Sequence, residues 1–108
     1  MALFVMIGEY TGELSEDLLD AHIAWLVPRF EAGTFLVSGG LDAVGDKPAS
    51  ALAIMEAEDR EDALRILDSE PFFQAGKIAH DVVPFHARVR GTGLDERFSG
   101  PDLLRVVG

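Results

Sequence analysis

Short, largely apolar segments alternate with amphipathic ones along this chain. The apolar segments have the length and flanking glycines that predict buried β-strands. Four of them occur, at residues 3–7, 34–38, 50–56 and 78–89. Pro84 lies inside the last segment, and a proline there favours an edge strand or a bulge because it has no backbone donor for a sheet.

The first amphipathic segment predicts a helix that begins after Ser15, a good N-cap, and ends at Gly33. Apolar side chains recur at helical spacing within it, and we expect this stripe to pack inward: Leu19, Ile23, Leu26 and Phe30. Pro28 removes one hydrogen bond from the helix and predicts a bend or a loosened turn.

The second amphipathic segment predicts a helix that begins after Asp59. It should end near Glu70, because a residue that precedes proline is disfavoured in the α conformation. Residues 71–76, with two aromatic side chains, are expected to form a turn. The order is therefore β-α-β-β-α-β, which predicts an α+β, ferredoxin-like fold: an antiparallel sheet with both helices on one face.

The predicted strands do not alternate apolar and polar residues, as strands of a sheet with one wet face should. Two helices cover one face, so the other must be covered by something else. We expect a homodimer through that sheet face. The alternative is that the C-terminal tail folds back over it. We divide the chain into a domain of residues 1–90 and an extension of residues 91–108, which we place at the dimer interface.

Charge and composition narrow the function. The 108 residues include 9 basic and 19 acidic ones, a net charge of −10, which disfavours nucleic-acid binding. There is no cysteine, hence no disulfide and no thiolate ligand. No apolar run is long enough for a membrane span and no signal peptide is recognised, so we expect a soluble cytoplasmic protein.

His22 is the first candidate for chemistry. Helical spacing places it with Trp25 and Arg29 on one flank of the apolar stripe, at the boundary between core and solvent. A pocket wall is expected at such a boundary. The alternative is a half-buried histidine bonded to a backbone carbonyl.

Two carboxylates, Asp68 and Glu70, flank the exit of the second predicted helix. The aromatic residues Phe72 and Phe73 follow and would exclude water from a carboxyl group, raising its pKa toward that of a general base. The alternative is a simple helix stop with both aromatic rings in the core.

The remaining candidate sites are weaker. His80 and His86 lie on the last predicted strand without a third ligand on the same face, so we interpret them as structural or solvent-facing and predict no metal site. Neither glycine pair has the strand–glycine–helix context of a nucleotide site. We therefore expect no cofactor.

Four stretches together resemble the YCII-related (YciI-like) family: residues 21–26, 31–40, 68–76 and 83–85. In the first stretch a helix histidine precedes aliphatic and aromatic residues, and the third holds a Pro-aromatic-x-x-Ala-Gly turn. The resemblance covers most of residues 2–87. It implies the ferredoxin-like fold of the dimeric α/β-barrel group, with a histidine–aspartate pair in a pocket near the dimer interface.

Carried over by position, the family histidine is His22 and the small-residue turn is at Gly39. The family's acid before proline is usually aspartate and is here Glu70, followed by Pro71 and Phe72. The extra methylene of glutamate leaves Asp68 as a second candidate partner for His22. By the same resemblance, Trp25 and Phe72 would be walls of the substrate pocket.

The resemblance also shows a departure. Many relatives carry an arginine–proline pair before the histidine, where this chain has Leu19 and Asp20. Arg29 is the candidate to replace that arginine.

Three functions remain open from the sequence. The leading one is a small cofactor-independent enzyme in which His22 is a general acid or base, with Glu70 or Asp68 as its partner, acting on a small aromatic or lactone-like molecule. The second is a dimeric module that binds or senses a small ligand without converting it. The third is an adaptor whose C-terminal tail docks on a partner.

Overall fold

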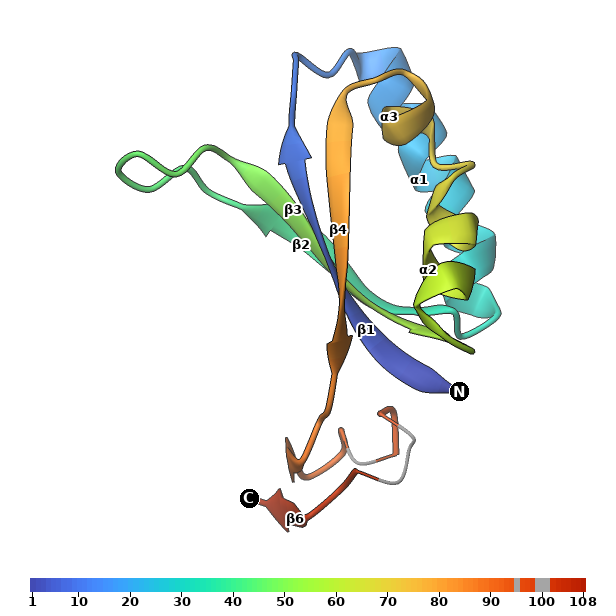
Figure 1. Ribbon diagram of the computed structural model, residues 1–108, viewed down its shortest axis with the longest axis vertical. Coiled ribbons are helices and arrows are strands. Elements are labelled where there is room, and N and C mark those ends of the chain that lie inside the picture. The colour runs from blue at the N-terminus through green and yellow to red at the C-terminus, as the bar shows by residue number, and fades with distance from the viewer. Residues whose placement is uncertain (95, 99–101) are drawn as a thin grey trace.

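The computed structural model describes residues 1–94, 96–98 and 102–108 (Figure 1). The elements follow in the order β1 (Ala2–Tyr10), α1 (Glu16–Glu31), β2 (Phe35–Leu41), β3 (Ser50–Ala57), α2 (Arg60–Leu67), α3 (Pro71–Gln74), β4 (Ile78–Phe85), β5 (Val89–Gly91) and β6 (Arg105–Val107). None of the helices that the structure describes is both long and apolar enough to cross a membrane.

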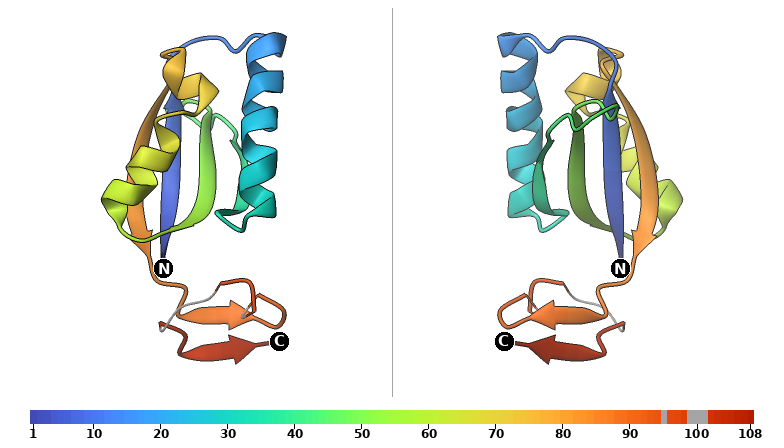
Figure 2. Two further views of the ribbon diagram at one scale, coloured as in Figure 1. Left: turned by 90° about the vertical axis from the view of Figure 1, so that its right-hand side faces the viewer. Right: turned by 90° about the vertical axis from the view of Figure 1, so that its left-hand side faces the viewer.

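Strands β1 to β4 form one antiparallel sheet in the order β2-β3-β1-β4. β1 lies between β3 and β4 and pairs with both. Helices α1 and α2 both lie on one face of this sheet (Figure 2). The predicted α+β, ferredoxin-like arrangement is confirmed. Pro84 lies in β4, which is an edge strand, as its missing donor requires.

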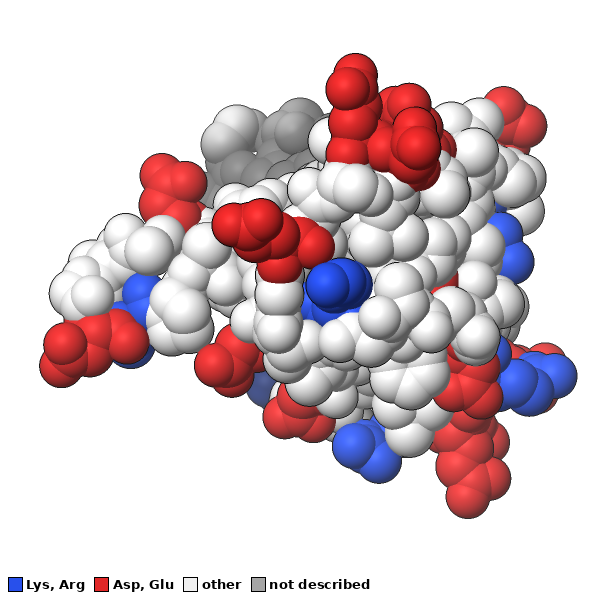
Figure 3. All heavy atoms as spheres, turned by 90° about the horizontal axis from the view of Figure 1, so that it is seen from above, with Lys and Arg blue, Asp and Glu red and all other residues white. Residues whose placement is uncertain are grey.

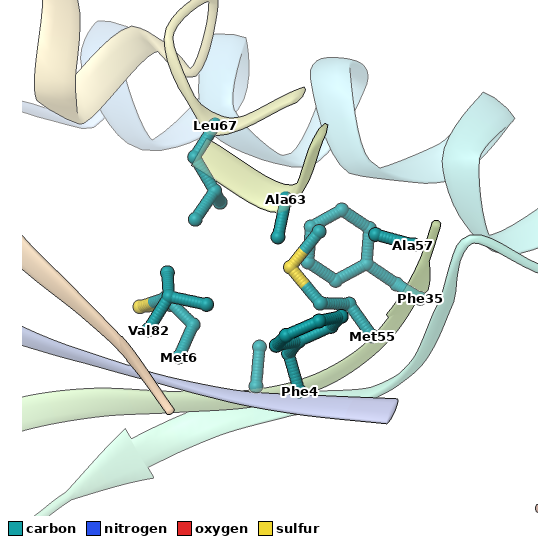
Figure 4. Packing of buried hydrophobic residues seen from close by; sticks show 9 residues of the cluster. Phe4, Met6, Phe35, Met55, Ala57, Ala63, Leu67 and Val82 are labelled. Atoms are coloured by element: carbon teal, nitrogen blue, oxygen red, sulfur yellow. The ribbon is translucent and has the colours of Figure 1, made fainter. Parts of the chain in front are cut away.

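The core lies between the sheet and α2 (Figure 4). Alternate residues of β1, Phe4 and Met6, point toward the helices and are nearly inaccessible to solvent. The core also contains Phe35, Ala53, Met55, Ala57, Ala63, Leu67 and Val82. Arg60 connects α2 to the edge strand by donating from Nε to the carbonyl oxygen of Val82, at 2.9 Å.

Helix α1 differs from expectation. It is capped by the Ser15 hydroxyl, which accepts from the Leu18 N–H at 3.1 Å, and it remains α-helical through Pro28. The chain then turns at Gly33, whose φ of +80° is open to glycine at little cost. However, no residue of α1 is fully buried. The inward stripe predicted at residues 19–30 does not sit in the core: Leu26 packs against the core cluster, and the Phe30 ring meets that of Phe35 at 6.0 Å.

Several boundaries also differ from the predicted ones. β1 continues past Gly8 to Tyr10, and α2 ends at Leu67, before Glu70. β2 continues through Gly39 and Gly40 instead of ending before them. The 71–76 segment contains the short helix α3 and not only a turn. The last predicted strand is divided into β4 and β5.

The sheet face opposite the helices is uncovered and largely apolar. Val5 pairs with Ile54 on one side and Val83 on the other, and Ile7 pairs with Leu52, so these side chains adjoin across three strands. Ile7 and Val83 are 43% and 45% exposed. The centre of the open face is therefore apolar, as the unbroken apolar strands predicted, while Glu56 and Asp81 also lie on this face as the strand partners of Leu3 and Ile7.

The C-terminal segment lies beyond the end of the sheet (Figure 2). Its strands β5 and β6 pair in parallel with each other. In the described residues, this ribbon leaves the apolar face of the main sheet open instead of folding over it.

Candidate active site

A cavity of about 300 Å³ lies between α1, α3 and the helix-side face of the sheet. Its walls are mostly apolar and include the α1 stripe of Leu19, Ile23, Leu26 and Phe30, together with Leu14 and Phe35 from outside the helix. Polar side chains also line it: Tyr10, His22, Ser38, Glu70 and His80. The apolar side chains of α1 therefore form the wall of a cavity more than they contribute to the core.

His22 and Glu70 form the central pair of this cavity. His22 Nδ1 lies 2.6 Å from Glu70 Oε1, and the two side chains are 20% and 3% exposed. Because an ionised carboxylate only accepts hydrogen bonds, Nδ1 must carry the proton of this bond. The other ring nitrogen, Nε2, is then the one that can exchange a proton with a ligand.

Glu70 is held in place by the helix that follows it. Its backbone is extended, as expected before Pro71, and it is the N-cap of α3. Its Oε1 accepts from the Phe72 N–H and its Oε2 from the Phe73 N–H, each at 2.9 Å. One side chain therefore starts a helix and orients the imidazole of His22.

The expected rise in the carboxyl pKa is wrong for Glu70. Burial does raise the pKa of Glu70, but the hydrogen bonds from His22, Phe72 and Phe73, with the charge of His22, outweigh it and hold the pKa below its usual 4.5. The carboxyl group is therefore ionised at neutral pH. It is suited to orienting His22 and not to removing protons itself.

Aromatic rings enclose the pair. The Phe72 ring stacks on the His22 imidazole, with centroids 4.0 Å apart and planes within 14°. Tyr10 meets the edge of Phe72 at 6.3 Å, and burial followed by the charge of Glu70 raises the pKa of Tyr10. These contacts restrict the orientation of the imidazole and keep water from one of its faces.

His80 is a site residue that the sequence analysis missed. It lies on the inward face of β4, between Ile78 and Val82, which are both buried. Its Nε2 lies 3.8 Å from Glu70 Oε2, and its ring stacks on Phe73 with centroids 5.3 Å apart. Burial lowers the pKa of His80, against the charge of Glu70. Its even spacing from the apolar residues of β4 was the available signal.

His86, the other histidine of that predicted strand, lies elsewhere. It follows the end of β4, and its Nδ1 lies 2.9 Å from Asp102 Oδ2 in the C-terminal segment. Both side chains are about half exposed.

The structure brings some of the other predicted residues to the cavity and leaves others outside. Trp25 lines it, and the Trp25 Nε1–H donates to Ser69 Oγ at 3.0 Å. Gly39 also lines it, and a β-carbon there would meet no atom within 4 Å. Pro71 begins α3 but is not among the described lining residues.

Of the two candidate acids, Glu70 is the one that meets His22. Asp68 is exposed at the end of α2, and its backbone carbonyl oxygen accepts a hydrogen bond from the Gln74 side chain.

Arg29, the expected replacement for the arginine that the family resemblance implied, is not among the described residues that line the cavity. Among the described residues that line the cavity there is neither a lysine nor an arginine. Arg29 instead lies over the Trp25 ring at 4.0 Å and donates to the Trp25 carbonyl oxygen at 2.8 Å. The surface seen from above in Figure 3 carries more acidic than basic side chains. The cavity therefore disfavours anionic ligands.

Within residues 1–94, 96–98 and 102–108, no three histidine, aspartate or glutamate residues are arranged to hold a metal ion. Glu70 and the two histidines near it are instead joined by hydrogen-bond and charge contacts. The expectation that no cofactor is used stays a prediction.

A family model described as YCII-related domain matches residues 2–86. The chain belongs to the YCII-related domain family. The match includes His22 and Glu70 and ends shortly after β4, so the C-terminal ribbon lies outside it. None of the curated proteins is similar enough in sequence to match the chain.

Solved structures are similar to this YCII-related protein to different degrees. One is 5-chloro-2-hydroxyhydroquinone dehydrochlorinase (TftG) from Burkholderia phenoliruptrix AC1100, in complex with 2,5-dihydroxybenzoquinone. It is 23% identical, with a TM-score of 0.59, over 77% of this chain and 92% of TftG. Another is the N63A mutant of SnoaB, a cofactor-independent oxygenase from Streptomyces nogalater, at 13% identity and a TM-score of 0.47, over 82% and 95% of the chains. At such identity, the likeness to TftG shows the fold alone.

Proposed function

We propose that this protein is a small cofactor-independent enzyme in which His22 is the general acid or base. The observation that supports this most is the bond of 2.6 Å between His22 Nδ1 and a buried, ionised Glu70 in the wall of an apolar cavity. The carboxylate fixes the tautomer and stabilises the imidazolium that forms when Nε2 takes a proton. A histidine placed in this way accelerates proton transfer by about 10²–10⁴-fold.

The substrate that we propose is a small aromatic or lactone-like molecule without a negative charge. An apolar cavity of about 150 Å³ is enough to bind benzene, so one of about 300 Å³ admits a ring with substituents. TftG, which shares the fold, holds a six-membered quinone ring. The absence of lysine and arginine from the described lining disfavours carboxylates and phosphates.

The test is to screen hydroxylated aromatic compounds and lactones for turnover by the wild type and by His22→Ala. We expect the variant to lose about 10²–10⁴-fold in kcat/KM while its circular dichroism is unchanged. His86→Ala, which changes an exposed histidine away from the cavity, is the matched control and should keep full activity. Turnover by His22→Ala at the wild-type rate would refute the role.

A second candidate is a module that binds a small ligand without converting it. The mostly apolar lining, with polar groups gathered around Glu70, is also typical of binding sites. The same screen separates the two functions. A compound that raises the melting temperature of the wild type and is recovered unchanged after prolonged incubation supports binding alone.

We also propose that the protein is a homodimer through the open sheet face. Ile7, Val37 and Val83 are each more than 40% exposed there, which is unfavourable for a monomer in water. Light scattering after size exclusion should give about twice the chain mass of 11.7 kDa, and Val83→Asp should halve the observed mass. A wild-type monomer at micromolar concentration would end this proposal.

The C-terminal extension is expected to contribute to that interface. Its strand β6 is exposed along its length, and Leu104, just before it, is 75% exposed. Deletion of residues 91–108 should weaken dimerisation. Unchanged dimerisation would assign the extension to another partner.

A further inference from the structure

His80 has a buried nitrogen whose hydrogen bonding is incomplete. The side chain is 4% exposed, and Nε2 has no hydrogen-bond partner within the part of the chain that the structure describes. An unmade hydrogen bond at a buried polar atom costs about 1–3 kcal/mol. The atom lies 3.8 Å from Glu70 Oε2.

We propose that His80 is a positioning residue for the His22–Glu70 pair, and that Glu70 holds the two imidazoles in opposite tautomers. In this arrangement His22 carries its proton on Nδ1 and His80 carries its proton on Nε2, each directed at a different oxygen of one carboxylate. The inference rests on the proposed function, because it assigns a task to a residue beside the proposed general base.

The two oxygens of Glu70 are occupied unequally. Oε1 accepts from His22 Nδ1 and from the Phe72 N–H. Oε2 accepts from the Phe73 N–H at 2.9 Å and retains room for a second donor, since a carboxylate oxygen accepts two bonds. His80 Nε2, at 3.8 Å, is the nitrogen that we propose for this second position.

Electrostatics selects the tautomer of His80. If Nε2 carried no proton, its lone pair would face a negatively charged oxygen across 3.8 Å, which is repulsive. A proton on Nε2 turns the same contact into an attraction. A shift of about 1 Å would bring it to the usual hydrogen-bond length of about 2.9 Å.

The surroundings favour this contact over others. Phe73 donates its N–H to Oε2 while its ring stacks on His80, so one residue positions both partners. Besides Glu70, the titratable groups that face this position are His22 from α1 and Tyr10 from β1.

The contact has a mechanical purpose. When His22 takes a proton on Nε2, its charge attracts Oε1 and would rotate the carboxylate, whose Oε2 is held by the Phe73 N–H. A second donor on Oε2 resists that rotation and disperses part of the charge. His80 would thereby keep Glu70 aligned through the proton transfer without itself touching the substrate.

Nuclear magnetic resonance of the ligand-free full-length protein tests this directly. Long-range ¹H–¹⁵N spectra of the imidazoles distinguish the tautomers, and ¹³C spectra of the glutamate carboxyl carbons follow the titration of Glu70. The variants are His80→Phe, which keeps a ring for Phe73 to stack on, His80→Gln, whose amide can donate from the place of Nε2, and His86→Phe as the control.

We expect the wild type to show the Nδ1–H form of His22 and the Nε2–H form of His80. His80→Phe should raise the Glu70 pKa by about 0.5–1 unit, through loss of one donor, and His80→Gln should restore it. His86→Phe should leave it unchanged.

A wild-type His80 in the Nδ1–H form would overturn the proposal. So would a Glu70 pKa that is the same in His80→Phe as in the wild type, or one that His80→Gln does not restore. If His80→Phe does not fold, the wild-type tautomers decide alone. These measurements need no substrate, so the inference can fail while His22→Ala still abolishes turnover, and the reverse.

Discussion

Helices α1 and α2 lie on the same face of one sheet but contribute to it in opposite ways. The 8-residue α2 has two buried residues, Ala63 and Leu67, whereas the 16-residue α1 has none. The side chains of α2 fill the space above β3 and β4, and those of α1 line a cavity of about 300 Å³. The α2 half of the helix layer therefore carries most of the packing, while the α1 half gives up packing to leave room for a ligand.

The largest expected effect on stability comes from comparing one substitution in each half of the helix layer. Met55→Ala opens a void beside Ala63 at a position that is 0% exposed, and should lower the free energy of unfolding by about 3 kcal/mol. Ile23→Ala, in α1 at 50% exposure, should lower it by less than about 1 kcal/mol. Urea unfolding at one fixed protein concentration measures both. Equal losses would mean that the cavity wall is packed as tightly as the core.

The next largest effect on stability is expected at Glu70, which lies between the two halves of the helix layer. Glu70→Gln removes the charge that holds His22 and leaves an amide group facing a backbone N–H of α3. The free energy of unfolding at pH 7 should fall by about 1–3 kcal/mol.

Asp68→Asn is the matched control, because Asp68 is exposed and its side chain is absent from the described cavity lining. It should change stability by less than about 0.5 kcal/mol. A loss in Asp68→Asn as large as that in Glu70→Gln would contradict the assignment of Glu70 as the partner of His22.

The smallest effect is the pH dependence of stability. Burial lowers the pKa of His80 from 6.5, so as the pH falls His80 is protonated in the unfolded chain before it is protonated in the folded one. Stability should therefore begin to fall as the pH drops below about 6.5. Glu70, lowered from 4.5 by its hydrogen bonds, adds a second loss below about pH 4.5. Melting temperatures between pH 8 and pH 3 measure both stages. His80→Phe should remove the upper stage, and its persistence in that variant would assign it to another group.

Much of this arrangement could be predicted from residues close together in the sequence. The apolar runs indicated where the strands lie along the chain, and the proline after Glu70 indicated where the second helix must end. The same proline and the aromatic residues that follow it indicated Glu70 as a candidate site residue. The candidate partner His22, 48 positions away, came from helical spacing and from family resemblance.

The rest depended on neighbours in space. Helical spacing showed that Leu19, Ile23 and Phe30 share a side of α1, but not whether that side meets a core or a cavity. Burial of Glu70 was foreseeable, yet the direction of its pKa shift depended on how many donors reach it. His80 was overlooked because the acid it approaches is on another element.

The double attachment of Glu70 makes the first turn of α3 and the orientation of His22 a single cooperative unit. Opening that turn releases the imidazole, and losing the imidazole loosens the turn. The Phe72 and Phe73 amides, both bonded to Glu70, should therefore exchange with deuterated water at one common rate. Any compound that occupies His22 should slow both amides together, which makes their exchange a signal for finding ligands before any reaction is known.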